Sequence, residues 1–450
     1  MAEARLAKFP QAPELHWAAA SRAVRRSRLL ARQGRVRQVV GLLVEAEGPL
    51  SEVGELCRVE EGGGEALAEV VGFREGRTLL MPLGALQGIR PGARVEALGR
   101  RLEIGLGEEM LGRVLDALGQ PMDGGGGWRV EERRPVLAEP PRPFERRPID
   151  EPLSVGVRVI DGLLTIGRGQ RVGLFAGSGV GKSTLLGMMA RGTDADVNVI
   201  ALVGERGREV GDFLGRDLGA DGLARSVVVV ATSDQPPVVR MKAAHTATAI
   251  AEFYRDRGMN VLLLMDSVTR FAMAAREAGL ATGEPPASKG YPPSVFAALP
   301  LLLERAGKTA SGSITGFYTV LVEGDDMNEP IADAVRGILD GHIVLSRRLA
   351  SRGHYPAVDL LESVSRLMPQ VTSPGHQALA QTYRRLLSVY REAEDLIQVG
   401  AYRPGSSREI DDALARIDAM NAFAVQGQES RVEMESTLRQ LEELFQGVPG

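Results

Sequence analysis

A glycine-rich segment of this sequence has the residue types and the setting of a phosphate-binding loop. A short apolar run, residues 171–176, leads into it, and a helix-like stretch follows at once. Glycines let successive backbone N–H groups turn toward phosphate oxygens, and a helix N-terminus adds the positive end of its dipole. The pattern predicts a P-loop in which Lys182 reaches the β and γ phosphates and Ser183 ligates Mg²⁺. The segment consists of Gly177, Ser178, Gly179, Val180, Gly181, Lys182, Ser183 and Thr184.

Two features bear on whether this segment binds phosphate. The first glycine of the usual P-loop pattern is replaced by Ala176, a small residue that fits if its φ angle stays negative. The alternative is a glycine-rich turn between a strand and a helix that binds nothing. The spacing and the flanking elements favour the P-loop. So does Lys182, because it is one of only five lysines among 54 basic residues.

Two carboxylates follow other apolar runs of the same region. Asp266 ends the run 260–266, and Glu205 comes shortly after the run 198–203. Because the carboxyl ends of parallel strands meet at one edge of a sheet, both side chains should lie beside the P-loop. There, Asp266 could hold Mg²⁺ through water, and Glu205 could polarise the water that attacks the γ phosphate. A helix cap for Asp266 and a solvated loop position for Glu205 are the alternatives.

The composition excludes several classes of protein. A formal net charge of −4 gives no overall bias toward nucleic acid or anionic lipid, so any such partner must be recognised by a local patch. There is no run of about 18 apolar residues, and the N-terminal MAEARLAKFPQ lacks the apolar core of a secretory signal. The single Cys57 excludes an intrachain disulfide, and the five histidines have no metal-ligand spacing. We therefore expect a globular protein of a reducing compartment.

The sequence pattern predicts a multidomain α/β protein. Short β-rich runs broken by glycines indicate a small barrel or sandwich near the N-terminus. Near-continuous apolar runs alternating with helical stretches indicate a parallel sheet covered on both faces. The predicted segments are an N-terminal basic helix (1–34), a small β-barrel domain (35–105), a linker rich in Gly, Pro and Arg (106–150), a nucleotide-binding domain (151–372) and a helical C-terminal domain (373–450).

Helix boundaries can be predicted at both ends of the chain. At the N-terminus, an arginine-rich helix should span residues 13–34 and end at Gly34. At the C-terminus, two helices should span about 375–398 and 408–446, divided by GAYRPGSS.

Four motifs together resemble one superfamily. GSGVGKST, GERGREV, LLLMDSVTR and HYPAVDLLESVSR, in this order and at these separations, resemble the catalytic subunits of rotary ATP synthases and their relatives, the type III protein-export ATPases. The likeness spans about residues 35–440. It implies a RecA-like P-loop ATPase core, ATP as the nucleotide, Mg²⁺ as the metal, and a homo-oligomeric ring, expected to be a hexamer.

The resemblance also implies roles for single residues at the matching positions. Lys182 and Ser183 would bind phosphate and Mg²⁺, with Asp266 also at the metal. Glu205 would be the catalytic base. The remaining implied positions are Arg206 and Arg270 near the phosphates, Tyr355 against the adenine ring, and Arg366 as an arginine finger that enters a neighbouring subunit's site.

Two stretches refine the resemblance. YPPSVFAALPLLLERAG (291–307) is similar to the export ATPases and departs from the catalytic subunits of rotary synthases. Residues 312–350 look more like the flagellar than the injectisome ATPase, chiefly through EGDDMNEP. The resemblance thus implies Mg²⁺-dependent ATP hydrolysis that energises type III export of flagellar proteins. An injectisome ATPase is the alternative.

The resemblance implies further partners and a location. A stator-like regulator would bind the N-terminal helix, and the ring would meet an export gate and export substrates with their chaperones. The arginines of that helix could also contact anionic lipid, which would place the protein in the cytoplasm at the inner face of the bacterial membrane. A solvated cap on the β domain is the second possible role for the helix.

Two further functional classes and a second role for Arg366 stay open at this point. A structural nucleotide-binding subunit would keep the P-loop and lack a base, and the presence of Glu205 counts against it. A ring RNA helicase needs a basic, aromatic surface in the β domain, whereas residues 38–100 contain a single aromatic, Phe73, so we expect no nucleic-acid partner. Finally, Arg366 could be a buried ion-pair partner instead of a finger.

Overall fold

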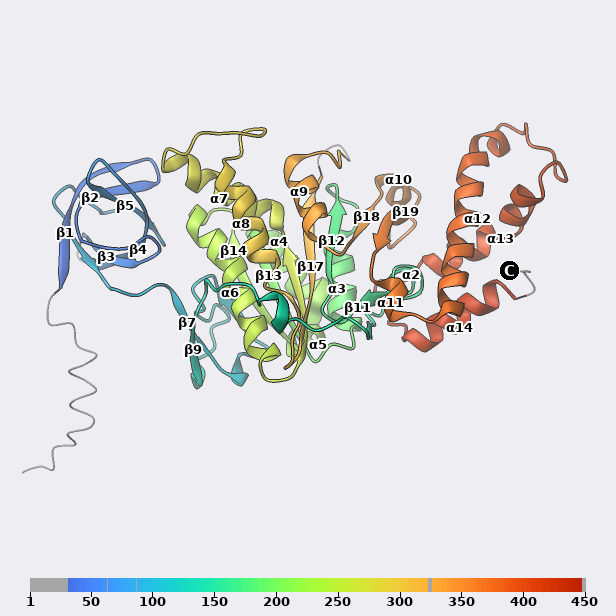
Figure 1. Ribbon diagram of the computed structural model, residues 1–450, viewed down its shortest axis with the longest axis horizontal. Coiled ribbons are helices and arrows are strands. Elements are labelled where there is room, and N and C mark those ends of the chain that lie inside the picture. Colours follow the sequence, from blue (N-terminus) through green and yellow to red (C-terminus); the bar gives the residue numbers. More distant parts are fainter. Residues whose placement is uncertain (1–30, 63, 86, 323–325, 447–450) are drawn as a thin grey trace, which may run out of the picture.

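The computed structural model describes residues 31–62, 64–85, 87–322 and 326–446 and arranges them as three successive parts (Figure 1). A β-barrel comes first, an α/β domain built on one large sheet follows, and a group of helices lies at the C-terminal end. This order agrees with the predicted fold class. None of the described helices is both long and apolar enough to cross a membrane.

Short strands close the barrel in the order β1-β2-β5-β4-β3-β6. Alternate side chains point inward and form its core, among them Val44, Val59 and Leu80, none of which is exposed. A barrel of this kind leaves no unpaired strand edge. Its strands are β1 (Arg32–Val40), β2 (Leu43–Glu47), β3 (Leu56–Glu61), β4 (Gly64–Arg74), β5 (Arg77–Pro82) and β6 (Arg94–Ala97).

The start of the barrel corrects one predicted boundary. Most of the predicted helix 13–34 lies outside the described residues, but its last three residues belong to strand β1. Gly34 pairs with Val95 of β6 and does not end a helix. A Cβ atom at Gly34 would lie 2.4 Å from the carbonyl oxygen of Glu47, so glycine is needed there because two strands approach closely.

The predicted linker is partly wrong, because segments of 106–150 are packed secondary structure. β8 (Val114–Asp116) pairs in parallel with β14 (Ser226–Thr232) and forms one edge of the central sheet. Leu115 is fully buried there. The nearby elements are β7 (Glu103–Leu106), η1 (Glu108–Met110), β9 (Glu132–Pro135), which pairs with β7, and η2 (Pro143–Glu145).

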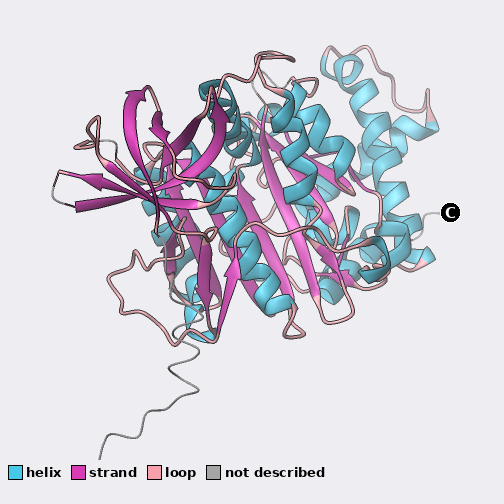
Figure 2. Ribbon diagram, turned by 60° about the vertical axis from the view of Figure 1, so that its left-hand side comes forward, coloured by secondary structure: helices cyan, strands magenta, loops and turns pink. Residues whose placement is uncertain are grey.

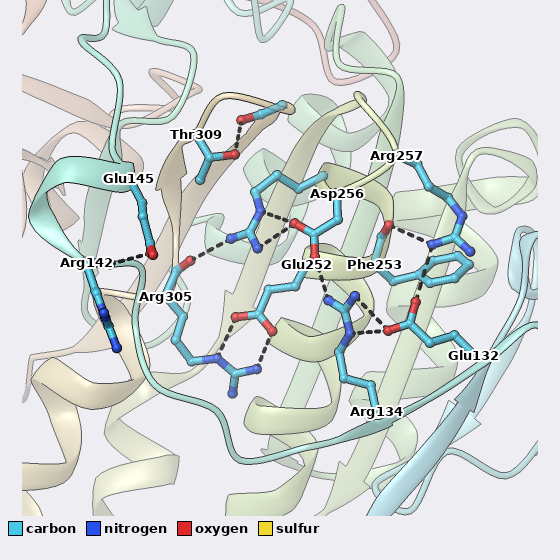
Figure 3. Close-up of polar contacts among 12 residues, drawn as sticks. Glu132, Arg134, Arg142, Glu145, Glu252, Phe253, Asp256, Arg257, Arg305 and Thr309 are labelled. Atoms are coloured by element: carbon cyan, nitrogen blue, oxygen red, sulfur yellow. Dashed lines mark hydrogen bonds and ion pairs between the residues drawn. The ribbon is translucent and has the colours of Figure 1, made fainter.

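Arginine ion pairs hold the predicted linker, around Arg134 of β9, against helix α6 (Pro237–Arg255) and the turn after it (Figure 3). Arg134 lies 2.9 Å from carboxylate oxygens of both Glu132 and Asp256. Glu132 is also 3.7 Å from Arg257, whose guanidinium stacks 3.4 Å from the centre of the Phe253 ring. Cation–π stacking and ion pairs therefore add to the apolar packing of this segment, in which Leu106 and Leu115 are fully buried.

A fully buried arginine extends the same network. Arg305 has no exposed surface and forms two hydrogen bonds, of 2.8 and 2.7 Å, with the carboxylate of Glu252 on α6. Its third nitrogen donates to the carbonyl of Val136 at 2.8 Å. A buried guanidinium is tolerated only when it is paired and hydrogen-bonded in this way.

The central sheet runs in the order β19-β18-β12-β17-β15-β13-β14-β8, with β16 pairing beside β17. The predicted apolar runs 171–176, 198–203 and 260–266 are all strands of this sheet, and their bounds lie within two residues of those predicted. The sheet is parallel except for β16 and β19. Its remaining strands are β12 (Arg171–Ala176), β13 (Val197–Glu205), β15 (Asn260–Asp266), β16 (Gly307–Lys308), β17 (Ser313–Leu321), β18 (Gly341–Leu345) and β19 (Val358–Ser365).

Helices cover both faces of the sheet (Figure 2), and each face is apolar because it packs into a separate hydrophobic core. Along β13, Val199 and Ala201 pack into one core, whereas Ile200 and Leu202 pack into the other. The first core includes α6, α7 and α8, and the second includes α2, α3 and the C-terminal helices. The remaining elements of this domain are β10 (Pro152–Leu153), β11 (Ile166–Gly167), α2 (Arg158–Leu163), α3 (Lys182–Gly192), α4 (Gly207–Asp212), η3 (Phe213–Leu218), α5 (Gly219–Ala224), α7 (Val268–Ala281), α8 (Pro293–Leu303), α9 (Pro330–Ile338), α10 (Arg347–Ser351) and α11 (Met368–Val371).

Between residues 373 and 446, where the structure describes the C-terminal part, three helices are present where two were predicted. α12 (Pro374–Gln398) has the predicted extent, but the predicted helix 408–446 is divided into α13 (Arg408–Ala424) and α14 (Met434–Leu444). The chain leaves the helix where the side chain of Gln426 donates to the carbonyl of Gly156 at 2.8 Å and accepts from the backbone of Arg158 at 2.9 Å. These bonds to the nucleotide-binding domain compete with helix continuation.

Candidate functional site

The predicted P-loop leaves the carboxyl end of β12 and enters α3 at Lys182. Gly179 and Gly181 have φ angles of 77° and 88°, a region that L side chains rarely adopt. A Cβ atom at Gly179 would meet nothing within 4 Å, so backbone conformation and not crowding requires glycine there. Ala176 stays in the extended strand, paired with β17 and β18, and this explains why the motif tolerates it.

Lys182 lies between two carboxylates. Its Nζ donates a hydrogen bond to Oδ1 of Asp266 and lies 3.9 Å from Oε1 of Glu205. The same oxygen of Asp266 accepts a 2.7 Å hydrogen bond from the hydroxyl of Thr319. The sheet order brings these groups together, because β12, β17, β15 and β13 are consecutive neighbours and their carboxyl ends share one edge.

Glu205 is not a solvated loop acid, because only 14% of its side chain is exposed. Burial raises the pKa of Glu205 to about 7, and the negative charge of Asp266 adds to this, while the positive charge of Lys182 opposes it. The neighbouring Glu209 is hydrogen-bonded to Glu205, and this bond lowers the pKa of Glu209. A carboxyl group with a pKa near 7 can accept a proton at physiological pH and release it again.

The first turn of α7 positions Arg270 and shows that Asp266 is not the cap of this helix. Ser267 is the N-cap of α7, and its hydroxyl accepts from the backbone N–H of Arg270 at 3.2 Å. The capping role considered for Asp266 is therefore taken by Ser267. The Nε of Arg270 is buried and has no hydrogen-bond partner among the described residues. Arg206, in contrast, is 78% exposed and lies 3.8 Å from Glu209.

Tyr355 lies against the P-loop. A Cβ atom at Gly181 would be 3.3 Å from the Tyr355 ring, which is half-exposed. The carbonyl of Tyr355 accepts a 2.9 Å hydrogen bond from the backbone of Gln426. An aromatic face is thus available next to the loop that would hold the phosphates.

Arg366 does not join the site of its own chain. It follows β19, which runs antiparallel to β18, and Ser365 lies opposite Gly341 at the start of β18. The P-loop is at the other end of the neighbouring β12, about 20 Å away at 3.3 Å per residue. Arg366 is exposed, and its Nη1 donates to the carbonyl of Leu339 at 3.1 Å. Within the described ranges it has no ion pair, so a buried ion pair is not what it forms.

A cavity of about 640 Å³ opens in front of the P-loop. Sequence reasoning missed five charged residues that line the cavity: Glu209, Asp212, Arg216, Asp217 and Arg347. Glu209 could have been found in GERGREV, whereas nothing in the sequence points to the other four. Val180, Tyr355 and Arg366 do not line the cavity. The predicted residues that do are Gly177, Ser178, Gly179, Gly181, Lys182, Ser183, Thr184, Glu205, Arg206, Asp266 and Arg270.

The residues present fit a polyphosphate with a hard cation. In the part of the chain that the structure describes, no group of three or more His, Cys, Asp or Glu side chains could hold a metal alone. A cation here would therefore share Ser183 and Asp266 with phosphate oxygens, which are the oxygen ligands that Mg²⁺ prefers. The unpartnered Nε of Arg270 and the N-terminus of α3 supply donors for the anion.

Comparison with known proteins matches each part of the chain. Residues 36–99 match the β-barrel domain of the ATP synthase alpha/beta family, and residues 156–365 match the nucleotide-binding domain of the same family. Residues 372–443 match the T3SS EscN ATPase C-terminal domain.

Individual relatives cover nearly the whole chain. The flagellum-specific ATP synthase of Bacillus subtilis (strain 168) is 56% identical over 92% of this chain and 95% of its own length. The type 3 secretion system ATPase of Xanthomonas euvesicatoria is 54% identical over 91% and 93%. The assembled ATPase EscN of enteropathogenic E. coli matches in structure with a TM-score of 0.86 and 45% identity, over 91% of this chain and 99% of that one. The chain therefore belongs to the ATP synthase alpha/beta family, in the group of flagellum-specific and type III secretion ATPases.

Proposed function

We propose that this ATPase hydrolyses ATP with Mg²⁺ in the cavity at the P-loop and uses the energy for type III export of flagellar proteins. The observation that carries the catalytic part is the position of Glu205. This carboxylate lies 3.9 Å from the P-loop lysine, and its pKa is raised to about 7. A nucleotide-binding subunit without activity would not need a base at that place.

Each residue of the site has a distinct task in this mechanism. Lys182 would exchange its bond to Asp266 for the β and γ phosphates, which would leave the Asp266 carboxylate available to the metal. Glu205 orients the attacking water and accepts its proton. Arg270 donates its unpartnered Nε to the phosphates as negative charge shifts toward the leaving group. Ser183, and Asp266 through water, would hold Mg²⁺, which when bound would supply positive charge against the phosphates.

Nucleotide specificity and ring closure concern three further residues. Tyr355 would stack on the adenine ring, since it stands beside Gly181. Arg206 would reach the phosphates from the rim of the cavity. Arg366 would act as an arginine finger on the neighbouring subunit, which its exposure and its distance from its own P-loop support. The ring is expected to be a homohexamer.

The export role and the partners rest on relatives. EscN has been solved assembled and in complex with its central stalk EscO. For this chain we propose a ring with a stalk-like partner, a stator-like regulator at residues 1–30, and an export gate that receives substrates with their chaperones. The protein would act in the cytoplasm at the inner face of the membrane. An injectisome ATPase is the second candidate, because a type 3 secretion relative is 54% identical.

The test combines assembly, turnover and export. Purified protein should form a six-fold species with Mg·ATP, and turnover per chain should rise on assembly. Expression in a strain that lacks its flagellar ATPase should restore motility, whereas expression in a strain that lacks its injectisome ATPase should not restore secretion. Equal turnover of monomer and ring would contradict the ring mechanism, and the reverse rescue pattern would favour the injectisome.

A further inference from the structure

Arg366 is an exposed residue whose backbone and guanidinium are both hydrogen-bonded to the residues that precede β18. Its backbone N–H donates to the carbonyl of Asp340 at 3.1 Å, and its Nη1 donates to the carbonyl of Leu339 at 3.1 Å. The preceding residue, Ser365, is buried and donates through its hydroxyl to the carbonyl of Thr165 at 2.8 Å. The backbone of Arg366 is therefore fixed, and its guanidinium keeps one hydrogen bond to its own chain.

The buried amide of Gln170 joins the two segments that lie beside Arg366 in space: the end of β19 at Ser365 and the residue Asp340 before β18. Gln170 has no exposed surface, and its Nε2 donates to Ser365 Oγ at 3.1 Å and to the Asp340 carbonyl at 3.3 Å. Its Oε1 accepts from the backbone of Gly167 at 2.8 Å. Both polar atoms of this side chain are thus used, and its Nε2 bonds only to Ser365 and Asp340, the two residues beside Arg366.

The carboxylate of Asp340 ties the same support to β12. It accepts from the backbone N–H of Arg171 and from two guanidinium nitrogens of that residue, each at 3.0 Å. Arg171 begins β12, the strand whose other end leads into the P-loop. A planar, bidentate pair of this kind fixes both direction and distance.

Close packing leaves this support little room to shift. A Cβ atom at Gly341 would lie 2.6 Å from the carbonyl oxygen of Val364 and 3.2 Å from Cα of Ser365. The start of β18 and the end of β19 therefore approach as closely as backbones can.

We propose that Gln170 and Asp340, together called the finger support, are positioning residues for Arg366. They hold its backbone so that the guanidinium is presented to the P-loop of the neighbouring subunit before that site is filled. This inference rests on the proposed finger role of Arg366. Pre-positioning matters because the long side chain otherwise loses rotamer freedom on engagement, and a misplacement of about 1 Å can cost about 100-fold in rate.

Two substitutions test the finger support. Gln170→Glu keeps an acceptor for Gly167 but places an acceptor against the Asp340 carbonyl. Asp340→Asn keeps the size of the side chain and removes the charge that Arg171 pairs with. For each variant, kcat should fall by about 100-fold while KM and Mg·ATP binding stay within about 2-fold, because the P-loop of the same chain is intact.

A matched control is available in Gln377. Its amide also donates to two carbonyls, those of Pro369 at 3.1 Å and Thr372 at 2.9 Å, at the start of α12. Neither bond goes to Arg366 or to its support. Gln377→Glu should therefore leave kcat within about 2-fold of the unaltered protein.

Mixed rings separate positioning from a general structural effect. Gln170→Glu chains have an intact P-loop and a misplaced finger, whereas Lys182→Ala chains have the reverse. Co-assembled, they should recover turnover at interfaces where the intact P-loop faces the intact finger. A merely unfolded or distorted chain would not recover. Asp340→Asn, at a side chain that is 23% exposed, carries the same test if the buried charge introduced by Gln170→Glu prevents assembly.

The outcomes distinguish this inference from the proposed function. Rings of Arg366→Ala with Lys182→Ala test the finger itself, and no recovery there would overturn both the finger role and its support. If those rings recover but rings of the finger-support variants with Lys182→Ala do not, the finger stands and the support is overturned. Unchanged kcat in both support variants would also overturn it.

Discussion

Lys182 and Asp266 form a hydrogen bond through the carboxylate oxygen that also accepts the Thr319 hydroxyl at 2.7 Å. The lysine is therefore already held at the mouth of the P-loop, and its charge is balanced by a group that would itself be needed at the metal. If Lys182 binds phosphate as proposed, its transfer to the phosphates would release Asp266 in the same step. Because the carboxylate of Asp266 is buried, its charge depends strongly on the neighbouring lysine as a partner.

We expect Lys182→Ala to abolish hydrolysis and to weaken nucleotide binding by at least about 10-fold, since the triphosphate charge loses its buried counter-ion. Turnover and the Kd for a fluorescent ATP analogue measure the two effects. Lys289→Ala is the control, because Lys289 is 59% exposed and lies 3.7 Å from the carboxylate of Asp326. Normal turnover of Lys182→Ala would refute the P-loop assignment.

Glu205→Gln should separate binding from chemistry. The amide keeps the position and size of the side chain but cannot accept a proton, so ATP should bind to assembled rings while kcat falls by about 10²–10⁴-fold. The control is Glu429→Gln, at a side chain that is 78% exposed and outside the cavity. A Glu205→Gln ring that turns over at the normal rate would mean that another residue orients the water.

The pH dependence of turnover follows from the same residue. The pKa of Glu205 is raised from 4.5 to about 7, first by burial and then by the charge of Asp266. A base works only when ionised, so kcat/KM should rise about 10-fold per pH unit below pH 7 and level off above it. A rate profile between about pH 5.5 and 8.5 measures this. A profile that is flat across this range would show that ionisation of Glu205 does not limit the reaction.

The buried pair Arg305–Glu252 should matter for stability and not for chemistry. Arg305→Leu leaves Glu252 buried without its partner, which should lower the free energy of unfolding by about 3–5 kcal/mol. Adding Glu252→Leu should restore much of that loss, because no uncompensated charge then remains. The control Arg208→Leu, at a side chain 92% exposed, should change stability by less than about 1 kcal/mol. Denaturant unfolding compares the four proteins, and equal stability of single and double variants would contradict the argument.

Removal of residues 2–30 tests the N-terminal partners. The boundary follows from the structure, because Arg32 already belongs to β1 and pairs with Glu55 at 2.6 Å. The shortened chain should keep basal hydrolysis and lose salt-sensitive binding to anionic vesicles or to an acidic regulator, since several arginines leave together. Co-sedimentation at low and high ionic strength measures this. Equal binding of both chains at every salt concentration would place the partner surface elsewhere.

The P-loop and the strands that carry it could be predicted from the sequence alone, because their signals are local. β12 and β15 have the predicted bounds, since each is a mostly apolar run followed by a break in the pattern: the glycines of the P-loop after Ala176, and Asp266 at the end of β15. The same local signals placed Lys182 just after one strand and Asp266 at the end of another, and the parallel-sheet rule then predicted their meeting.

Other features were decided by contacts between distant parts of the chain. Gln426 breaks a helix because it bonds to Gly156, 270 residues earlier in the chain. β8 joins the sheet although its surroundings have the composition of a linker, because β14 offers an unpaired edge. The support of Arg366 likewise depends on Gln170 and Ser365, 195 residues apart. Local residue pattern carries no information about such pairings, so only the folded chain, in which these groups become neighbours, determines them.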